Sequence, residues 1–329
     1  MGLVAIRRSG LLIIFALLLG WWMPQRVIAQ NGTTSTTNSV DNSEIQPLAV
    51  AALLLQVSRA GQRLIAVGDF GDLLLSDDSG KHWRQIVVPT RALLVRAFFI
   101  NAQEGWVVGH DAVILHTTDG GEHWSLQYAD PKGNTPLFDI YFSDDQHGLA
   151  VGAYGSCLRT ADGGTHWQQC TVNAEEDYHL NRLIVTTAGL FIAAEAGRIY
   201  RSQDQGAHWQ AIDSGYQGSL FGILELANHD MLAYGLRGHV LFSTDAGASW
   251  QPRKTAVLAT LMDAVQLPGG SIVISGTAGT LLISSDQGKT FRIREQPNRA
   301  AILSLLPLPN QGLLLAGEHG VSVIQAMQP

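Results

Sequence analysis

The chain contains one eight-residue pattern six times at a nearly constant spacing. The pattern is Ser/Thr-x-Asp-x-Gly-x-x-Trp/Phe, and successive aspartates are separated by 41, 43, 42, 41 and 41 residues. A period of about 40 with several short strand-like runs in each unit is typical of a β-propeller, in which each repeat forms a four-stranded blade. The six matches are Asp boxes, and their aspartates are Asp78, Asp119, Asp162, Asp204, Asp245 and Asp286.

Each residue type in the Asp box suits a tight turn between two strands. The Ser/Thr hydroxyl and the Asp carboxylate can bond to nearby backbone amides, and the glycine accepts the positive φ that such a turn requires. The aromatic residue starts the next strand and can pack between blades. Because the six aspartates recur around a rim and do not converge on one point, we interpret them as structural, and not as a catalytic or metal-binding array.

The strands inside one unit follow a constant order. In the second unit, Val95–Ile100, Gly105–Gly109, Val113–Thr117 and Trp124–Tyr128 are expected to run from the inner to the outer strand. The same layout fits about residues 51–88, 92–129, 137–173, 180–213, 219–253 and 258–295. The sequence therefore predicts an all-β fold with blades of four strands each.

A seventh unit begins at Ala301 and has neither an Asp box nor a fourth strand. An open ring would leave strand edges unpaired, which proteins avoid. We therefore expect a segment within Val40–Leu48 to supply the missing outer strand and close the ring. The prediction is a seven-bladed β-propeller with an N-terminal closing strand, forming a single domain over residues 40–329.

The first 29 residues resemble an export signal. Arg7 and Arg8 form a basic start, Leu11–Leu19 an apolar stretch, and Val27–Ala29 a small-residue cleavage site. A retained membrane anchor is the alternative, and Arg7-Arg8 leaves Sec and twin-arginine export both open. Residues 30–39 form a polar leader that is expected to be disordered. We thus expect a periplasmic protein, or one in a thylakoid-lumen equivalent if the host is phototrophic.

The charge of the exported chain excludes some partners. Removing residues 1–29 takes away three arginines and no acidic residue, so the net charge changes from −7 to −10. An acidic domain binds nucleic acid and anionic lipid poorly, because both require clustered Lys and Arg. No later segment is long and apolar enough to cross a membrane. The exported chain is also expected to be a monomer.

The two cysteines are placed to face each other across one predicted hairpin. Pairing Thr160 with Trp167 in the third unit also sets Cys157 opposite Cys170. In an oxidising compartment this register predicts a disulfide, and reduced, inert thiols are the alternative.

Two stretches resemble a known family. Gly105–Trp124 begins Gly-Trp-Val-Val-Gly and ends in an Asp box, and Gly148–Trp167 has the same layout. They resemble the repeats of the photosystem II assembly/stability factor family of cyanobacteria and chloroplasts and of its bacterial relatives. The resemblance implies a seven-bladed propeller without catalysis, which in phototrophs chaperones a newly made reaction-centre subunit. In other bacteria it implies an accessory to an envelope transport complex. No Cys lies near the cleavage site, so no lipid anchor is implied.

One face of the predicted propeller carries the candidate partner-binding residues. The start of each inner strand and the turn between the second and third strands lie at the same end of a blade, opposite the Asp boxes. Charged and aromatic side chains at this end suit recognition of a polypeptide tail. Together with the family resemblance, this predicts a membrane protein or its exported tail as the partner. The inner-strand candidates are Arg96, Asp139, Arg182 and Asp263, and the turn candidates are His110, Tyr154, Glu195 and Arg237.

Two other functions remain open from the sequence. Asp boxes also occur in sialidases and other glycoside hydrolases, and Asp139 and Asp263 could face each other across the channel as the two carboxylates of a glycosidase. The second alternative is a propeller that binds carbohydrate without hydrolysing it. No cofactor and no metal are expected, because the histidines at 82, 123, 166 and 208 only precede Asp-box aromatics and show no ligand spacing within a repeat.

Overall fold

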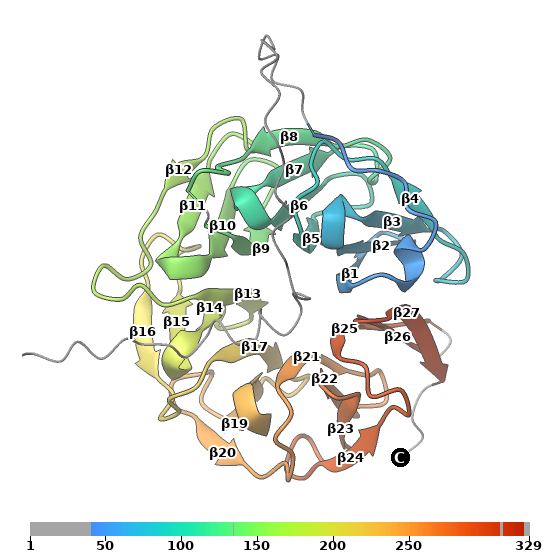
Figure 1. The fold of residues 1–329 in the computed structure, drawn as a ribbon. Helices are drawn as coiled ribbons and strands as arrows, with labels where there is room; N and C mark the ends of the chain where they lie inside the picture. The colour runs from blue at the N-terminus through green and yellow to red at the C-terminus, as the bar shows by residue number, and fades with distance from the viewer. Residues whose placement is uncertain (1–40, 134, 310–311, 326–329) are drawn as a thin grey trace, which may run out of the picture. The chain divides into compact units, whose positions relative to one another are not determined.

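The computed structural model describes residues 41–133, 135–309 and 312–325. The predicted signal, the leader and Val40 lie outside these residues. The described residues belong to one compact unit. The described strands make seven antiparallel sheets arranged around a central axis as the blades of a propeller (Figure 1). No helix in the described part of the chain is both long and apolar enough to cross a membrane.

Six sheets have four strands in sequence order, and the seventh has three among the described residues. The strands are β1 (Leu54–Ala60), β2 (Arg63–Gly68), β3 (Leu73–Ser76) and β4 (Arg84–Ile86) in blade 1; β5 (Leu94–Phe99), β6 (Gly105–Gly109), β7 (Ile114–Thr117) and β8 (Ser125–Tyr128) in blade 2; β9 (Leu137–Phe142), β10 (Gly148–Gly152), β11 (Cys157–Thr160) and β12 (Gln168–Gln169) in blade 3; β13 (Leu180–Thr186), β14 (Gly189–Ala194), β15 (Arg198–Ser202) and β16 (Gln210–Asp213) in blade 4; β17 (Leu220–Glu225), β18 (Met231–Gly235), β19 (Val240–Ser243) and β20 (Gln251–Arg253) in blade 5; β21 (Leu261–Gln266), β22 (Ile272–Gly276), β23 (Thr280–Ser284) and β24 (Arg292–Glu295) in blade 6; and β25 (Ile302–Pro307), β26 (Gly312–Gly317) and β27 (Gly320–Gln325) in blade 7.

Short 3-10 turns make up the rest of the regular structure in the described residues. They are η1 (Ala49–Ala51), η2 (Asp69–Gly71), η3 (His110–Ala112), η4 (Ala153–Gly155), η5 (Glu195–Gly197) and η6 (Leu236–Gly238). The seven-bladed all-β propeller predicted from the repeat is thus confirmed.

The closing segment differs from the prediction. Residues 41–48 contain no strand and do not pair with blade 7. Instead they run beside the outer strand of blade 1. The N–H of Ser43 donates to the carbonyl of Val88, and the N–H of Val88 donates to the hydroxyl of Ser43. The side-chain amide of Gln85 accepts from the N–H of Gln46 and donates to the carbonyl of Glu44. These polar pairs hold the segment to blade 1. The ring closes where β1 packs against blade 7 through a shared core that includes Leu54 and Leu314.

The core lies between neighbouring blades. The second strand of each blade is buried almost throughout, so both of its faces contribute to a core. The Asp-box aromatic of each blade packs into the core that its blade shares with the preceding one. Trp124, for example, packs with residues of blades 1 and 2, and Phe291 with residues of blades 5 and 6. The sequence prediction that these aromatics pack between blades is confirmed.

The Asp-box turn is held by a short hydrogen-bond network. In blade 3, the hydroxyl of Thr160 donates to Asp162 (2.9 Å) and accepts from the N–H of Gly164 (2.9 Å). The Asp162 carboxylate accepts from the N–H of His166 (2.9 Å). Gly164 has a φ of 87°, the left-handed region that favours glycine. The turn therefore uses each residue type for the structural reason expected.

This network predicts acid sensitivity. Hydrogen bonds from the backbone and ring of His166 hold the pKa of Asp162 at about 2, and Ser249 and Thr290 do the same for Asp245 and Asp286. Because these pKa values lie below the unfolded value of about 3.9, the stabilisation is present above pH 4 and is lost as the pH falls towards 2. Thermal unfolding across this range should show Tm falling, and Asp245→Asn should flatten the fall. An unchanged slope would contradict this assignment.

Cys157 and Cys170 form a disulfide in blade 3, with a Cα–Cα distance of 5.0 Å. The pairing of Leu158 with Gln169 gives the register expected from the sequence. Since β12 has only two residues, the bond fixes the outer strand to its neighbour. Replacing both cysteines by serine should lower the free energy of unfolding by about 3 kcal/mol, as expected for a loop of this length. Denaturant titration measures the change, and a loss below about 1 kcal/mol would show that the bond is dispensable.

Candidate functional site

Every inner strand carries a β-bulge near its start, and the residue after the bulge occupies the same place in each blade. In blade 2, Leu94 pairs with Gly109, but Arg96 already pairs with Val108. The same shift occurs in the other six blades. The seven equivalent residues, here called the mouth ring, are Gln56, Arg96, Asp139, Arg182, Gly222, Asp263 and Ser304.

The two carboxylates of the mouth ring connect neighbouring blades. Asp139 accepts a hydrogen bond from the N–H of Leu183 in blade 4 (2.9 Å). Asp263 accepts one from the N–H of Leu305 in blade 7 (2.8 Å). Each also accepts from the N–H of the residue that follows it. Both side chains are therefore bound on two sides by the scaffold.

Two neutral members of the mouth ring make the same kind of connection. Gln56 accepts from the N–H of Ala97 (2.6 Å) and donates to its carbonyl (3.2 Å), so it joins blades 1 and 2. Ser304 accepts from the N–H of Val57 (3.2 Å) and joins blade 7 to blade 1. The sequence alignment began with the second unit and so missed Gln56. Its place two residues into the first inner strand could have revealed it.

The two arginines of the mouth ring have different surroundings. Arg182 donates to Asp263 (2.6 Å) and to the hydroxyl of Tyr234 (3.3 Å). Arg96 forms an ion pair with Asp139, with Nε 3.4 Å from the carboxylate, and within the described part of the chain this Nε has no hydrogen-bond partner. The side chains of Arg96 and Arg182 remain 18% and 22% exposed. Arg96 is thus the less completely bound of the two.

The pKa shifts of the two arginines follow from these surroundings. Burial, together with the nearby charge of Arg182, lowers the pKa of Arg96. Burial also acts to lower the pKa of Arg182, but the charge of Asp263, the hydrogen bond to it and the charge of Asp139 outweigh this effect, so the pKa is raised. Burial raises the pKa of Asp139, against the effect of both arginines. The four charged residues therefore act on one another as a single group.

Tyr234 is a member of this group that the sequence analysis missed. It lies on β18 and is 1% exposed. A Cβ atom on Gly222 would lie 2.2 Å from the Tyr234 hydroxyl, so the glycine in the mouth ring makes room for it. Burial raises the pKa of this phenol. The sequence signal for Tyr234 was Gly222, because the other six blades have a polar or charged residue at this position.

The turns between the second and third strands surround the mouth ring at the same end of the blades. In six of them the middle residue has a φ between 51° and 57°. Phe70 and Tyr154 are 62% and 64% exposed despite their size. Bulky residues rarely adopt this conformation, and such strain is concentrated at functional sites. The six residues are Phe70, Asp111, Tyr154, Ala196, Arg237 and Ala278.

The four predicted turn residues are placed in two ways. Tyr154 and Glu195 both contact His179. The backbone N–H of Tyr154 donates to the His179 ring (3.0 Å), and the backbone N–H of His179 donates to the Glu195 carboxylate (3.3 Å). Arg237 is exposed at the tip of its turn, and His110 begins the turn η3. Burial lowers the pKa of His110. Thus the structure brings Arg96, Asp139, Arg182 and Asp263 together, and the turn residues lie on blades 2 to 5 around them.

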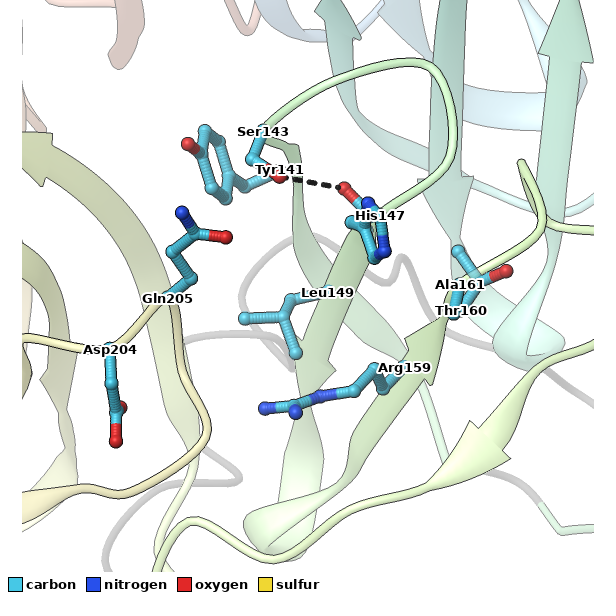
Figure 2. Close-up of a pocket in the computed structure, with 10 residues that line it drawn as sticks. Tyr141, Ser143, His147, Leu149, Arg159, Thr160, Ala161, Asp204 and Gln205 are labelled. Atoms are coloured by element: carbon cyan, nitrogen blue, oxygen red, sulfur yellow. Dashed lines mark hydrogen bonds between the residues drawn. The ribbon is translucent and has the colours of Figure 1, made fainter.

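A separate pocket of about 230 Å³ lies between blades 3 and 4 at the Asp-box end (Figure 2). Arg159 crosses it to donate to the carbonyl of Gly206. Asp204 is the one carboxylate among its lining residues and is bound by Ser202 and His208. The pocket therefore lacks the two carboxylates that most glycosidases use. No group of three or more His, Cys, Asp or Glu suited to a metal ion occurs among the described residues.

Comparisons with known proteins agree with this architecture. A family model described as "Photosynthesis system II assembly factor YCF48" matches residues 39–134 and 130–254, about two thirds of the chain. The chain belongs to the YCF48 family. The photosystem II assembly lipoprotein Ycf48 of Synechococcus sp. (strain CC9902) is 33% identical over 60 residues, which cover 17% of this chain and 18% of that protein. The alignment thus spans less than a fifth of that relative.

Solved structures resemble the chain over most of its length. A structure titled "YCF48 bound to D1 peptide" covers 89% of this chain and 99% of its own, with a TM-score of 0.70 and 20% identity. YCF48 from Cyanidioschyzon merolae gives a TM-score of 0.69 at 16% identity, over 86% of this chain and 98% of its own. An ancestral GH74 enzyme gives 0.67 at 13% identity, over 86% of this chain and 46% of its own. At these identities the likeness establishes the propeller fold alone.

Proposed function

We propose that this YCF48-family chain is a non-catalytic assembly factor that binds an extended segment of a membrane protein at its mouth ring. Family membership and the solved relative bound to a D1 peptide support a protein partner. In a phototrophic host the partner is a photosystem II subunit. In another bacterium it belongs to an envelope complex or transporter.

The observation that carries the proposal is that the two aspartates of the mouth ring are fully hydrogen-bonded to the scaffold, whereas Arg96 is not. Asp139 and Asp263 are bound by backbone N–H groups of neighbouring blades, whereas Arg96 has a buried Nε without a hydrogen-bond partner in the described residues. A buried donor left unpaired is costly. Because the Arg96 side chain is 18% exposed, its guanidinium can turn to pair with a carboxylate or carbonyl of a bound peptide. The exposed aromatics Phe70 and Tyr154 add apolar contact area around this point.

The same geometry supports a function without catalysis. A glycosidase needs one carboxylic acid and one carboxylate free to reach the substrate. Here both acidic residues of the mouth ring are held by backbone donors and by arginines. Their role in the scaffold argues against hydrolysis at this site. A glycosidase or a carbohydrate-binding propeller remains the competing proposal.

The location is part of the proposal. The basic start, apolar stretch and cleavage site within residues 1–29 support export to the periplasm, or to the thylakoid lumen in a phototroph. Export would place the mouth ring where tails and loops of membrane proteins emerge. It would also supply the oxidising conditions that suit the Cys157–Cys170 disulfide.

An affinity capture from host envelopes tests the proposal. Tagged wild-type chain is compared with an Arg96→Ala/Arg182→Ala variant, and with Arg201→Ala as a matched control on the third strand of blade 4. We expect the wild type and the control to recover one membrane protein, and the double variant to recover at least about tenfold less, because a planar guanidinium is lost at the centre of the site. Circular dichroism and thermal unfolding establish that each variant is folded.

Other outcomes decide against the proposal. Equal recovery by the double variant would place binding away from the mouth ring. Capture of no protein, together with release of sugar from a glycan panel, would favour the glycosidase. Glycan binding without release would favour the carbohydrate-binding propeller.

A further inference from the structure

Within the described residues, the third strand of the last blade has no fourth strand beside it. In blades 1 to 6 the third strand is paired with a fourth, but within the described residues β27 is paired with β26 alone (Figure 1). The antiparallel ladder of β26 and β27 leaves alternate N–H and C=O groups of β27 directed outwards. Such an edge can accept another strand.

Side chains that are covered in the other blades are exposed in blade 7. The register makes Val323 equivalent to Leu75 in blade 1 and to Ile283 in blade 6. Leu75 is 1% exposed and Ile283 is 6% exposed, and both lie on third strands that are paired with a fourth. Val323 is 46% exposed. The difference marks the place that a fourth strand would occupy.

The core beneath this edge also lacks its aromatic side chain. Each of the other six inter-blade cores contains the aromatic residue that starts a fourth strand, such as Trp83 between blades 7 and 1. The core between blades 6 and 7 is formed in the described residues by aliphatic side chains, among them Leu281, Leu305 and Leu313. In the other six blades, the equivalent position beside the third strand is therefore occupied by an extended strand that begins with an aromatic residue.

The edge also lacks the features that protect other strand edges. The sequence of β27 is Gly-Val-Ser-Val-Ile-Gln, with six residues and no charge. The fourth strands of the other blades are shorter, and several carry arginine or proline, as in β20 and β24. Charges, proline and short length discourage strand addition. β27 is therefore the strand at the rim that is best suited to pair with another chain.

We propose that β27 is a second docking site, which accepts an extended segment of a partner protein as the fourth strand of blade 7. The segment begins with a Trp or Phe that enters the core between blades 6 and 7, and its backbone pairs with β27. This is strand addition, in which backbone bonds give affinity and a side-chain pocket gives specificity. The site lies on the rim and is distinct from the mouth ring.

A peptide taken from the chain itself tests this site. The fluorescent probe is a synthetic copy of residues 117–128, which contains the Asp box, the aromatic Trp124 and the fourth strand of blade 2. Fluorescence anisotropy is measured with the purified full chain. We expect saturable binding that weakens about tenfold or more when the probe carries Trp124→Ala, since a buried aromatic dominates such interfaces. Val323→Lys in the chain should weaken binding similarly, and Val185→Lys, at a residue 56% exposed on blade 4, should not.

Several results would overturn the proposal. These are absence of binding, equal binding of the alanine probe, or equal loss with Val185→Lys. Hydrogen exchange on the chain without probe must be rapid at those N–H groups of residues 320–325 that do not bond to β26. Slow exchange at these outward-facing groups would mean that the position of the fourth strand is already filled. A dimer in sedimentation that Val323→Lys dissociates would then identify a second copy as the occupant, and a protected monomer would identify a segment of this chain.

Discussion

Replacing Asp263 by alanine is expected to lower the free energy of unfolding by about 3–5 kcal/mol. The side chain is 6% exposed, and its carboxylate accepts hydrogen bonds from the N–H groups of Ala264 and Leu305. It is also the ion-pair partner of Arg182. Removal of one partner leaves buried donors and a buried charge without an acceptor, which costs more than an exposed ion pair contributes.

Chemical denaturation measures this effect against a matched variant. Asp213→Ala removes an aspartate that is 64% exposed and 3.7 Å from Arg198. Since exposed pairs contribute about 0–1 kcal/mol, this variant should unfold close to the wild type. Equal, small losses for both variants would show that Asp263 does not join blades 6 and 7.

Replacing Trp106 by alanine should cost about 3–5 kcal/mol of unfolding free energy, the range for deleting a large buried aromatic side chain. Trp106 is 0% exposed and lies in the core between blades 2 and 3. Its ring is stacked between His116 and Phe142. The substitution removes both stacking contacts and leaves a cavity.

Phenylalanine at the same position separates packing from polarity. The Nε1 of Trp106 has no hydrogen-bond partner in the described part of the chain. Trp106→Phe therefore removes ring volume without breaking a hydrogen bond, and it should cost clearly less than the alanine variant. Denaturant titrations of both variants check this order. A phenylalanine variant as unstable as the alanine variant would contradict the stacking account.

The repeat predicted the fold because each blade repeats the same physical requirements. The Asp-box spacing set the blade length, and the pairing of Thr160 with Trp167 placed Cys157 opposite Cys170. These are local properties of a hairpin, with residues close in sequence. The order of four strands in a unit followed from the same alternation of apolar runs and turns.

The closing of the ring could not be derived in this way. The sequence predicts that a segment within Val40–Leu48 forms the outer strand of blade 7, because an unpaired edge is unfavourable there. In the structure, residues 41–48 contain no strand. Their polar groups instead bind Gln85 and Val88 in blade 1. The general preference for paired strand edges does not predict which blade the segment joins, because specific hydrogen bonds such as those of Gln85 and Val88 determine it.

The sequence alignment predicted that the charged residues of the mouth ring occupy equivalent positions, but not what they contact. Alignment of the inner strands placed Arg96, Arg182 and the two aspartates at one end of the ring. It could not show that the aspartates join blades, because the bond from Leu183 to Asp139 spans 44 residues. Tyr234 and His179 come from other strands and loops, and only the folded ring brings them to the site.

The most direct test of the central claim is photo-cross-linking in host envelopes. A benzophenone amino acid replaces Phe70 or Tyr154 on the mouth-ring face, where aromatic residues already stand exposed. In the control it replaces His123 or His208, each 91% exposed in an Asp-box turn. The account predicts one cross-linked membrane protein from the first pair and none from the second. Cross-links from the Asp-box face, or from neither face, would contradict it.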